Sequence, residues 1–164
     1  MVEVFISLGS NLVNRLENLN QARLMIESDM GRLFRQSSIY ETDAYGNEDQ
    51  PKFLNQIVSV LSNEAPSVIL GKLMRMEEKM GRKRSIKWEP RIIDLDILFY
   101  GSGIVKLDNL IIPHPEIEFR KFVLMPLIEL IPTFIHPFVN SSLLELSNKC
   151  KDSLSVKIHN HVTK

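Results

Sequence analysis

The most constraining feature of the sequence is an apolar segment, Arg91 to Tyr100 ("RIIDLDILFY"), that carries two aspartates. Aliphatic, β-branched and aromatic residues dominate the segment, which is typical of a β-strand buried in a core. Asp94 and Asp96 are two residues apart, so on a strand both side chains point to the same face, roughly 7 Å apart from the strand rise alone. Adjacent ionised carboxylates are unfavourable in a core unless positive charge neutralises them. A fold that contains this strand must therefore bring cations to one face of it.

Two arrangements relieve the repulsion between such carboxylates. One is a hard divalent cation, since Mg²⁺ binds one or two carboxylates together with substrate phosphates. The other is a set of arginine partners. A strand end where both side chains reach water or form salt bridges is the alternative interpretation of the pair. The upstream segment Gly81 to Arg91 favours the first, because it concentrates five basic residues against one acid in a chain of zero net charge. Arginine and lysine bind phosphate oxygens, so the two segments predict a site for a metal-bound polyphosphate. A solvated basic loop paired with surface acids is the alternative.

Length, charge and cysteine content limit the number of domains, the kinds of partner and the cellular location that we expect. The 164 residues suffice for one domain, 1–164, with a real core, and we expect a frayed tail over residues 155–164. The 20 Lys and Arg residues balance 20 Asp and Glu residues, which argues against nucleic-acid or membrane partners. A single cysteine, Cys150, excludes an internal disulfide, and no signal peptide or long apolar run is found. We therefore expect a cytoplasmic monomer that acts on small molecules.

The order of the expected elements favours one fold class. Strand-favouring residues bounded by turn signals predict strands at residues 2–8, 33–42, 53–61 and 94–98. Helical spacing of apolar residues predicts helices over residues 12–26, from Pro66 to Gly81, and from Pro126 to Ile131. The resulting β-α-β-β-α-β order, followed by a C-terminal extension, predicts an α+β, ferredoxin-like sandwich. In such a fold an antiparallel sheet has helices packed on it.

Other segments carry residue types suited to a flat heterocycle. Phe53 and Asn55 share a strand face, where the ring can stack and the carboxamide can both donate and accept hydrogen bonds. His114 is held between two prolines and could donate to a phosphate or a ribose. Arg120 and Phe122 offer a second cation and a second ring. For each of these residues, core packing or a structural turn is the alternative interpretation.

Glu77 is open to two interpretations. It lies four residues after Leu73, beside the apolar stripe of the second predicted helix. It could reach the polyphosphate site, or it could pair with a nearby lysine as a boundary residue. The sequence favours neither.

Five segments together resemble the 6-hydroxymethyl-7,8-dihydropterin pyrophosphokinase family of folate biosynthesis. They are "SLGSN" (7–11), "YETDAYGNEDQPKFLN" (40–55), "EEKMGRKR" (77–84), "WEPRIIDLDILFYG" (88–101) and "IPHPEIEFRKFVLMPLIEL" (112–130). The resemblance thus covers about residues 1–130. It implies a ferredoxin-like fold and the transfer of pyrophosphate from ATP to the hydroxymethyl group of the pterin, with release of AMP.

The resemblance also implies roles for the matching positions. It implies two Mg²⁺ ions on Asp94 and Asp96, and because such transfer depends on positioning and charge neutralisation, we expect Arg82 and Arg91 to be catalytic cations. The residues implied to contact ATP are Glu77, Arg84, Trp88, Ile97, His114 and Arg120. The residues implied to hold the pterin are Thr42, Tyr45, Phe53, Asn55 and Phe122. The loops around Asn47 and Ser85 would act as lids.

Three positions depart from the family pattern, and two rival functions stay open. Glu89 stands where a small residue is usual, Asp43-Ala44 occupies a loop where a proline is common, and Ile111 stands where some relatives have a hydroxyl. A nucleotidyltransferase would release pyrophosphate instead of AMP. An RNA-binding sheet would display aromatics on two central strands, whereas here the first strand offers Phe5 alone and the fourth displays acids.

Overall fold

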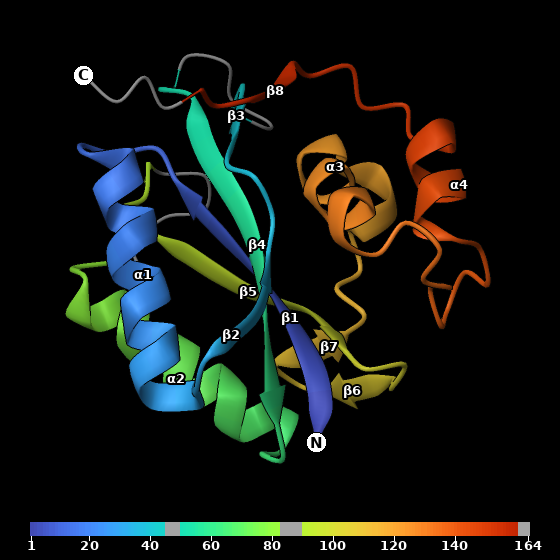
Figure 1. Ribbon diagram of the computed structural model, residues 1–164, viewed down its shortest axis with the longest axis horizontal. Helices are drawn as coiled ribbons and strands as arrows, with labels where there is room; N and C mark the ends of the chain where they lie inside the picture. The colour runs from blue at the N-terminus through green and yellow to red at the C-terminus, as the bar shows by residue number, and fades with distance from the viewer. Residues whose placement is uncertain (45–49, 83–89, 161–164) are drawn as a thin grey trace.

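The computed structural model describes residues 1–44, 50–82 and 90–160, which form a sheet with helices on both faces (Figure 1). The six-stranded sheet has the order β5-β1-β4-β3-β8, with β2 also paired to β4, and β6 and β7 form a separate hairpin. The strand pairings are antiparallel. The strands are β1 (Val2–Ser10), β2 (Leu33–Gln36), β3 (Tyr40–Thr42), β4 (Phe53–Ser62), β5 (Asp94–Tyr100), β6 (Val105–Leu107), β7 (Leu110–Ile112) and β8 (Val156–Ile158). The helices are α1 (Arg15–Met30), α2 (Pro66–Lys79), α3 (Lys121–Leu130) and α4 (Leu143–Lys149), with a 3₁₀ turn at Ile117–Phe119.

The first face of the sheet packs against α1 and α2. Alternate side chains of β1, β4 and β5 point to this face, as the period of a strand requires. The strand residues of this core include Val4, Ile6, Leu8, Leu54, Val58, Val60, Leu95 and Ile97, and the helix residues are Leu19, Ala22, Ile26, Ile69, Leu73 and Met76. This half of the molecule confirms the predicted α+β arrangement of an antiparallel sheet with helices on it.

The second face of the sheet packs against α3 and α4, which lie on the opposite side from α1 and α2 (Figure 1). Its buried residues include Phe5, Ile57, Leu98, Phe99, Val123, Leu124, Leu127, Leu143 and Leu146. Strands covered on both faces read as nearly continuous apolar runs, which explains why β4 is apolar at successive positions. The sequence predicted one helical layer clearly, and the structure adds a second.

Local sequence signals explain several element ends. α2 begins with Pro66 at its first position, where a missing N–H costs nothing. Gly31 follows α1 with φ 97°, and Gly81 follows α2 with φ 91°, conformations that glycine adopts without steric strain. The β1–β5 register shifts beside Ile6, so that Leu98 and Phe99 both reach the second-face core.

The prediction of one strand over residues 33–42 is wrong, because β2 and β3 are separate. Four residue steps lead from Gln36 to Tyr40, but three steps separate their partners on β4, so the chain carries a β-bulge here. The Oγ of Ser37 accepts the N–H of Ile57 at 3.0 Å, which replaces part of the regular ladder. The bulge is invisible to residue propensities, because it depends on the partner strand.

The predicted short helix from Pro126 to Ile131 is also wrong at its start, because α3 begins at Lys121 and contains Pro126. The N–H of Lys121 donates to Asp152 Oδ2 at 2.9 Å. This acceptor lies 31 residues away in the chain, so no local signal marks where the helix begins.

The predicted frayed tail over residues 155–164 is wrong for its first part. Residues 156–158 form β8, which pairs with β3, and the N–H of His159 donates to the carbonyl of Ile39 at 2.8 Å. Backbone pairing with β3 orders this polar stretch, whose composition alone gives a weak strand signal. The helix α4, which the sequence did not predict, starts with a capping box between Ser142 and Glu145. No helix of the described residues has the length and apolar character to cross a membrane.

Candidate active site

A cavity of about 180 Å³ opens on the second face of the sheet, beside α3. Strand pairing places Asp94, Gly9 and Asn55 in one row across β5, β1 and β4, and it places Asp96 opposite Ser7 in the next row. Gly9 and Ser7 are small, so the floor of the cavity is low between the carboxylates of β5 and the carboxamide of β4. The start of α3 supplies the opposite wall with Arg120, Phe122 and Val123.

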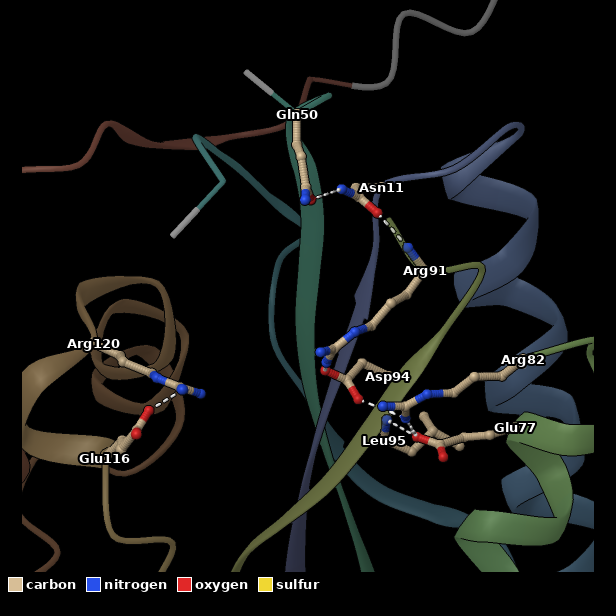
Figure 2. A network of polar contacts seen from close by, with 9 residues as sticks. All are labelled: Asn11, Gln50, Glu77, Arg82, Arg91, Asp94, Leu95, Glu116 and Arg120. Atoms are coloured by element: carbon tan, nitrogen blue, oxygen red, sulfur yellow. Dashed lines mark hydrogen bonds and ion pairs between the residues drawn. The ribbon is translucent and has the colours of Figure 1, made fainter. Parts of the chain in front are cut away.

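Two arginines converge on Asp94 (Figure 2). Arg82 Nη1 lies 2.7 Å from Asp94 Oδ1, and Arg91 Nη1 lies 2.5 Å from Asp94 Oδ2. Asp96 lines the same cavity. Burial, followed by the charges of Asp94 and Glu77, raises the pKa of the Asp96 carboxyl well above its usual range. The prediction that both aspartates share one face is confirmed, and in the structure two arginines supply the positive charge beside Asp94.

Glu77 connects α2 to the start of β5. Its side chain is buried, and Oε1 accepts the N–H of Leu95 at 2.8 Å while it also forms an ion pair with Arg82 (Figure 2). Burial raises the pKa of Glu77. The structural partner that the sequence suggested was a lysine, whereas the structure gives an arginine. Glu77 thus orients a guanidinium that reaches Asp94.

Asn11 joins two loops at the rim of the cavity (Figure 2). Its buried side chain donates through Nδ2 to Gln50 Oε1 at 3.2 Å and to the carbonyl of Pro51 at 3.3 Å. Its Oδ1 accepts the N–H of Arg91 at 2.7 Å, and its own N–H donates to the Arg91 carbonyl at 3.2 Å. The backbone of Arg91 is therefore fixed where its guanidinium meets Asp94.

His114 and Arg120 face the carboxylates from the other side. The N–H of His114 donates to the carbonyl of Leu98 at 3.0 Å, and its Nδ1 accepts the N–H of Glu116 at 3.2 Å. Burial, followed by the charge of Arg120, lowers the pKa of His114 to about 4. The ring is therefore neutral near pH 7 and carries its proton on Nε2. Arg120 forms an ion pair with Glu116, and its Cζ lies 5.7 Å from the centroid of the Phe122 ring.

The end of the cavity nearest β3 holds a fixed carboxamide and is lined by two aromatic rings. Asn55 is buried, and its Nδ2 donates to Thr42 Oγ1 at 2.7 Å. This bond sets the orientation of the amide plane. Phe53 from β4 and Phe122 from α3 line the same cavity. Rings beside an oriented amide suit a flat, hydrogen-bonding heterocycle.

Comparison with known proteins agrees with this geometry. The model of the family described as 7,8-dihydro-6-hydroxymethylpterin-pyrophosphokinase (HPPK) matches residues 5–132. The chain belongs to this family. It is accordingly a pyrophosphokinase of folate biosynthesis with ATP as co-substrate, and the predicted family and enzyme class are confirmed.

Two bacterial relatives match this pyrophosphokinase over most of their length. The 2-amino-4-hydroxy-6-hydroxymethyldihydropteridine pyrophosphokinase of Aquifex aeolicus is 36% identical over 145 residues, which cover 88% of this chain and 90% of that protein. The protein of the same name from Haemophilus influenzae is 34% identical over 161 residues, which cover 97% of this chain and 99% of that protein.

Other relatives are longer proteins that contain a region like this chain. The mitochondrial folate synthesis bifunctional protein of Pisum sativum is 43% identical over 133 residues, which cover 81% of this chain and 26% of that protein. The crystal structure of wild-type Plasmodium falciparum HPPK-DHPS with pteroate matches with a TM-score of 0.74 at 18% identity, and the match covers 90% of this chain and 44% of that chain. This structural likeness supports the fold, and this chain spans less than half of such proteins.

The cavity brings together most of the residues predicted for the pyrophosphokinase site: Thr42, Phe53, Asn55, Arg91, Asp94, Asp96, His114, Arg120 and Phe122. Glu77, Arg82 and Ile97 are not among its described lining residues. Glu77 and Arg82 connect to it through Asp94, whereas the side chain of Ile97 is buried in the first-face core. The predicted residues Tyr45, Arg84 and Trp88, the positions Asn47 and Ser85, and the departure at Glu89 lie outside the described residues. Within the described ranges, no cluster of three or more histidine, cysteine or carboxylate side chains could hold a metal ion by itself.

Several residues of the site were missed from the sequence. Ser7, Gly9 and Gln50 line the cavity, and Asn11 fixes its rim. The signal for Ser7 and Gly9 was the alternation within the first strand, where small residues at every second position mark an uncovered stretch of one face. The role of Asn11 had no such signal, because its partners come from two distant loops.

Proposed function

We propose that this pyrophosphokinase holds ATP and the pterin side by side in the second-face cavity and transfers the diphosphate between them. The hydroxymethyl oxygen forms a bond to the β-phosphorus of ATP, the bond from that phosphorus to the α,β-bridging oxygen breaks, AMP leaves, and the alcohol proton passes to base or solvent. The observation that carries the proposal is that the aspartate pair and the ring-binding residues line one cavity. A triphosphate and a heterocycle can therefore meet without either leaving its own binding groups.

The pterin would occupy the end of the cavity nearest β3. There Phe53 and Phe122 would stack on the two faces of the ring, and the oriented amide of Asn55 would read its hydrogen-bonding edge. Thr42 holds that amide in place. Tyr45 is also proposed to contact the pterin, on the basis of its position in the sequence motif of residues 40–55.

Asp94 and Asp96 would hold two Mg²⁺ ions together with the triphosphate. The donor set fits, because two carboxylates face one cavity and Mg²⁺ prefers such carboxylates combined with phosphate oxygens. Bound Mg²⁺ would neutralise the triphosphate and activate the hydroxymethyl oxygen for attack.

Arg82 and Arg91 would orient the phosphates. In the structure both guanidinium groups contact Asp94. A divalent cation on that carboxylate would weaken this electrostatic attraction, and the two guanidinium groups would then be available to phosphate oxygens, which arginine binds well. Glu77 limits how far Arg82 moves, because it forms an ion pair with the same guanidinium.

The remaining ATP contacts would come from the α3 side and from the basic loop. His114 would donate from Nε2, and Arg120 would supply a fixed positive charge. Ile97 could contact the nucleotide through its backbone, because its side chain faces the opposite core. Arg84 and Trp88 are also proposed to contact ATP, on the basis of their positions in the sequence motifs. We also infer a cytoplasmic location without nucleic-acid or membrane partners, from the zero net charge and the single cysteine.

The direct test is product analysis with ATP, Mg²⁺ and 6-hydroxymethyl-7,8-dihydropterin. We expect AMP to form with the pterin present, at a rate far above that without it. Asp94→Asn and Asp96→Asn should each reduce the rate by about 100-fold or more, while Asp108→Asn, in the exposed β6–β7 turn, should leave it unchanged. Pyrophosphate in place of AMP would indicate a nucleotidyltransferase. Full activity in both aspartate variants would refute the assigned metal site.

A further inference from the structure

The segment that connects α4 to β8 contacts two separate walls of the cavity. It lies beyond residues 5–132, the range that the family model matches. In Figure 1 it leaves α4, passes above α3 and continues into β8 beside β3 at the upper end of the sheet. Its contacts are specific, and they fall beside the residues proposed to hold the pterin.

The first contact is at the start of α3. Asp152 Oδ2 accepts the N–H of Lys121 at 2.9 Å, and Asp152 Oδ1 accepts the N–H of Leu154 at 3.0 Å. Within the described residues, Arg120 at the N-cap position makes no side-chain capping bond. Asp152 thus replaces the local cap, and its negative charge is favourable at a helix N-terminus. Lys121 lies between Arg120 and Phe122, both of which line the cavity.

The second contact is at β3. Val156 pairs with Thr42, the residue that accepts the hydrogen bond from the Asn55 amide. Just before it, Ser155 and Asp43 exchange two hydrogen bonds, from the N–H of Asp43 to the Ser155 carbonyl and from the N–H of Ser155 to Asp43 Oδ2, each at 3.4 Å. The segment therefore supports the strand that orients the carboxamide.

We propose that residues 152–158 form a brace that fixes the spacing between Phe122 on α3 and the Thr42–Asn55 pair on β3, with Asp152 as a positioning residue for the pterin. This inference rests on the proposed function, because it takes the pterin to lie between those two walls. The brace does not contact the pterin itself but positions Phe122 and the Thr42–Asn55 pair. Its loss therefore changes the spacing of the pterin slot without removing any group that contacts the substrate. The carboxylates on β5 that would hold the triphosphate make neither contact with the brace, whereas Arg120, a proposed ATP contact, is the residue before Lys121.

The test compares three variants with a matched control. Asp152→Ala removes both accepted bonds, Asp152→Asn keeps one acceptor oxygen, and a chain that ends at residue 154 keeps Asp152 but lacks β8. Asp108→Ala removes an exposed carboxylate from the β6–β7 turn and serves as the control. For each variant, KM for the pterin, KM for ATP, kcat and Tm are measured, and Phe122→Ala is measured in parallel.

We expect Asp152→Ala to raise KM for the pterin by a factor between about twofold and thirtyfold, the range that corresponds to a lost cap. The kcat should stay unchanged, and KM for ATP should rise less than KM for the pterin, because the α3 contact lies beside Arg120 as well as Phe122. Asp152→Asn should give a smaller rise in KM for the pterin. The shortened chain, which keeps the Asp152 contact, should raise KM for the pterin selectively. A lower Tm with both KM values unchanged would show a merely structural role and overturn the brace, as would equal rises in both KM values. Loss of pterin affinity in Phe122→Ala but not in Asp152→Ala would overturn the brace alone. Unchanged pterin affinity in both variants would overturn the proposed pterin site as well.

Discussion

Gly9 gives the sharpest prediction about the shape of the site. It lies in the floor of the cavity, paired with Asn55 on one side and Asp94 on the other. A Cβ atom added at Gly9 would lie 3.0 Å from Asn55 Oδ1 and 3.7 Å from Phe53 Cδ1. The amide of Asn55 cannot withdraw freely, because its Nδ2 is bonded to Thr42 Oγ1 at 2.7 Å. Gly9→Ala must therefore displace the group that we propose reads the pterin.

The expected magnitude follows from that hydrogen bond. Weakening one buried hydrogen bond costs about 0.5–1.5 kcal/mol, which corresponds to roughly a twofold to tenfold weaker pterin affinity. Isothermal titration of the pterin into protein saturated with a non-hydrolysable ATP analogue measures this change, and titration of the analogue alone should match the wild type.

Gly71→Ala is the matched control for Gly9→Ala. Gly71 lies inside α2, where an added Cβ would meet Arg75 Nη1 at 3.5 Å, an ordinary contact. This variant should gain up to about 1 kcal/mol in free energy of unfolding from helix propensity, with both affinities unchanged. If Gly9→Ala binds the pterin with the affinity of the wild type, Asn55 and Gly9 do not together shape the slot.

Three further predictions concern groups around the site. Glu77→Ala should lower the free energy of unfolding by about 2–4 kcal/mol, because the Leu95 N–H and Arg82 lose a buried partner. Glu77→Gln keeps an acceptor oxygen and should lower the free energy of unfolding by less. Equal decreases for the two variants in urea unfolding would contradict this reasoning. Tyr40→Phe should lower the free energy of unfolding by about 1–3 kcal/mol, because Tyr40 Oη donates a hydrogen bond of 2.8 Å to Glu129 Oε2. Burial, together with this bond, raises the pKa of Tyr40 to about 12. A spectroscopic titration in which Tyr40 ionises at pH 10 would count against the contact. His136 Nδ1 accepts hydrogen bonds from the N–H groups of Phe138 and Val139. Burial lowers the pKa of His136 in the folded protein, although the charge of Glu118 opposes this shift. As the pH drops below 6.5, the unfolded chain therefore takes up this proton before the folded protein does, and the free energy of unfolding should fall. His136→Asn keeps an acceptor that does not titrate, so its stability should depend less on pH, and an identical dependence would exclude His136 as the cause.

Local patterns in the sequence predicted much of the fold. β5 was found from its apolar residues, α2 from Pro66 and its helical stripe, and the turn after α1 from Gly31. These features depend on neighbours in the chain, so residue types alone report them. The bulge between β2 and β3, the start of α3 and the strand β8 depend on partners far along the chain, and each was missed.

The site divides in the same way. Asp94, Asp96, Phe53 and Asn55 were found because each pair lies two residues apart on one strand, which forces a common face. Gly9 was missed, because its importance comes from the strand register that places it between a carboxylate and a carboxamide. Contacts such as those made by Asn11 and Asp152 need the folded chain before they exist.

In the proposed function, Asp94 and Asp96 hold divalent cations that bind the triphosphate. A crystal structure with Mg²⁺ and a non-hydrolysable ATP analogue measures this directly. We predict Mg²⁺ within coordination distance of both carboxylates and of phosphate oxygens, with Arg82 and Arg91 moved from Asp94 to the phosphates. Nucleotide bound with both arginines still on Asp94, and no ion between the carboxylates and the phosphates, would contradict the account.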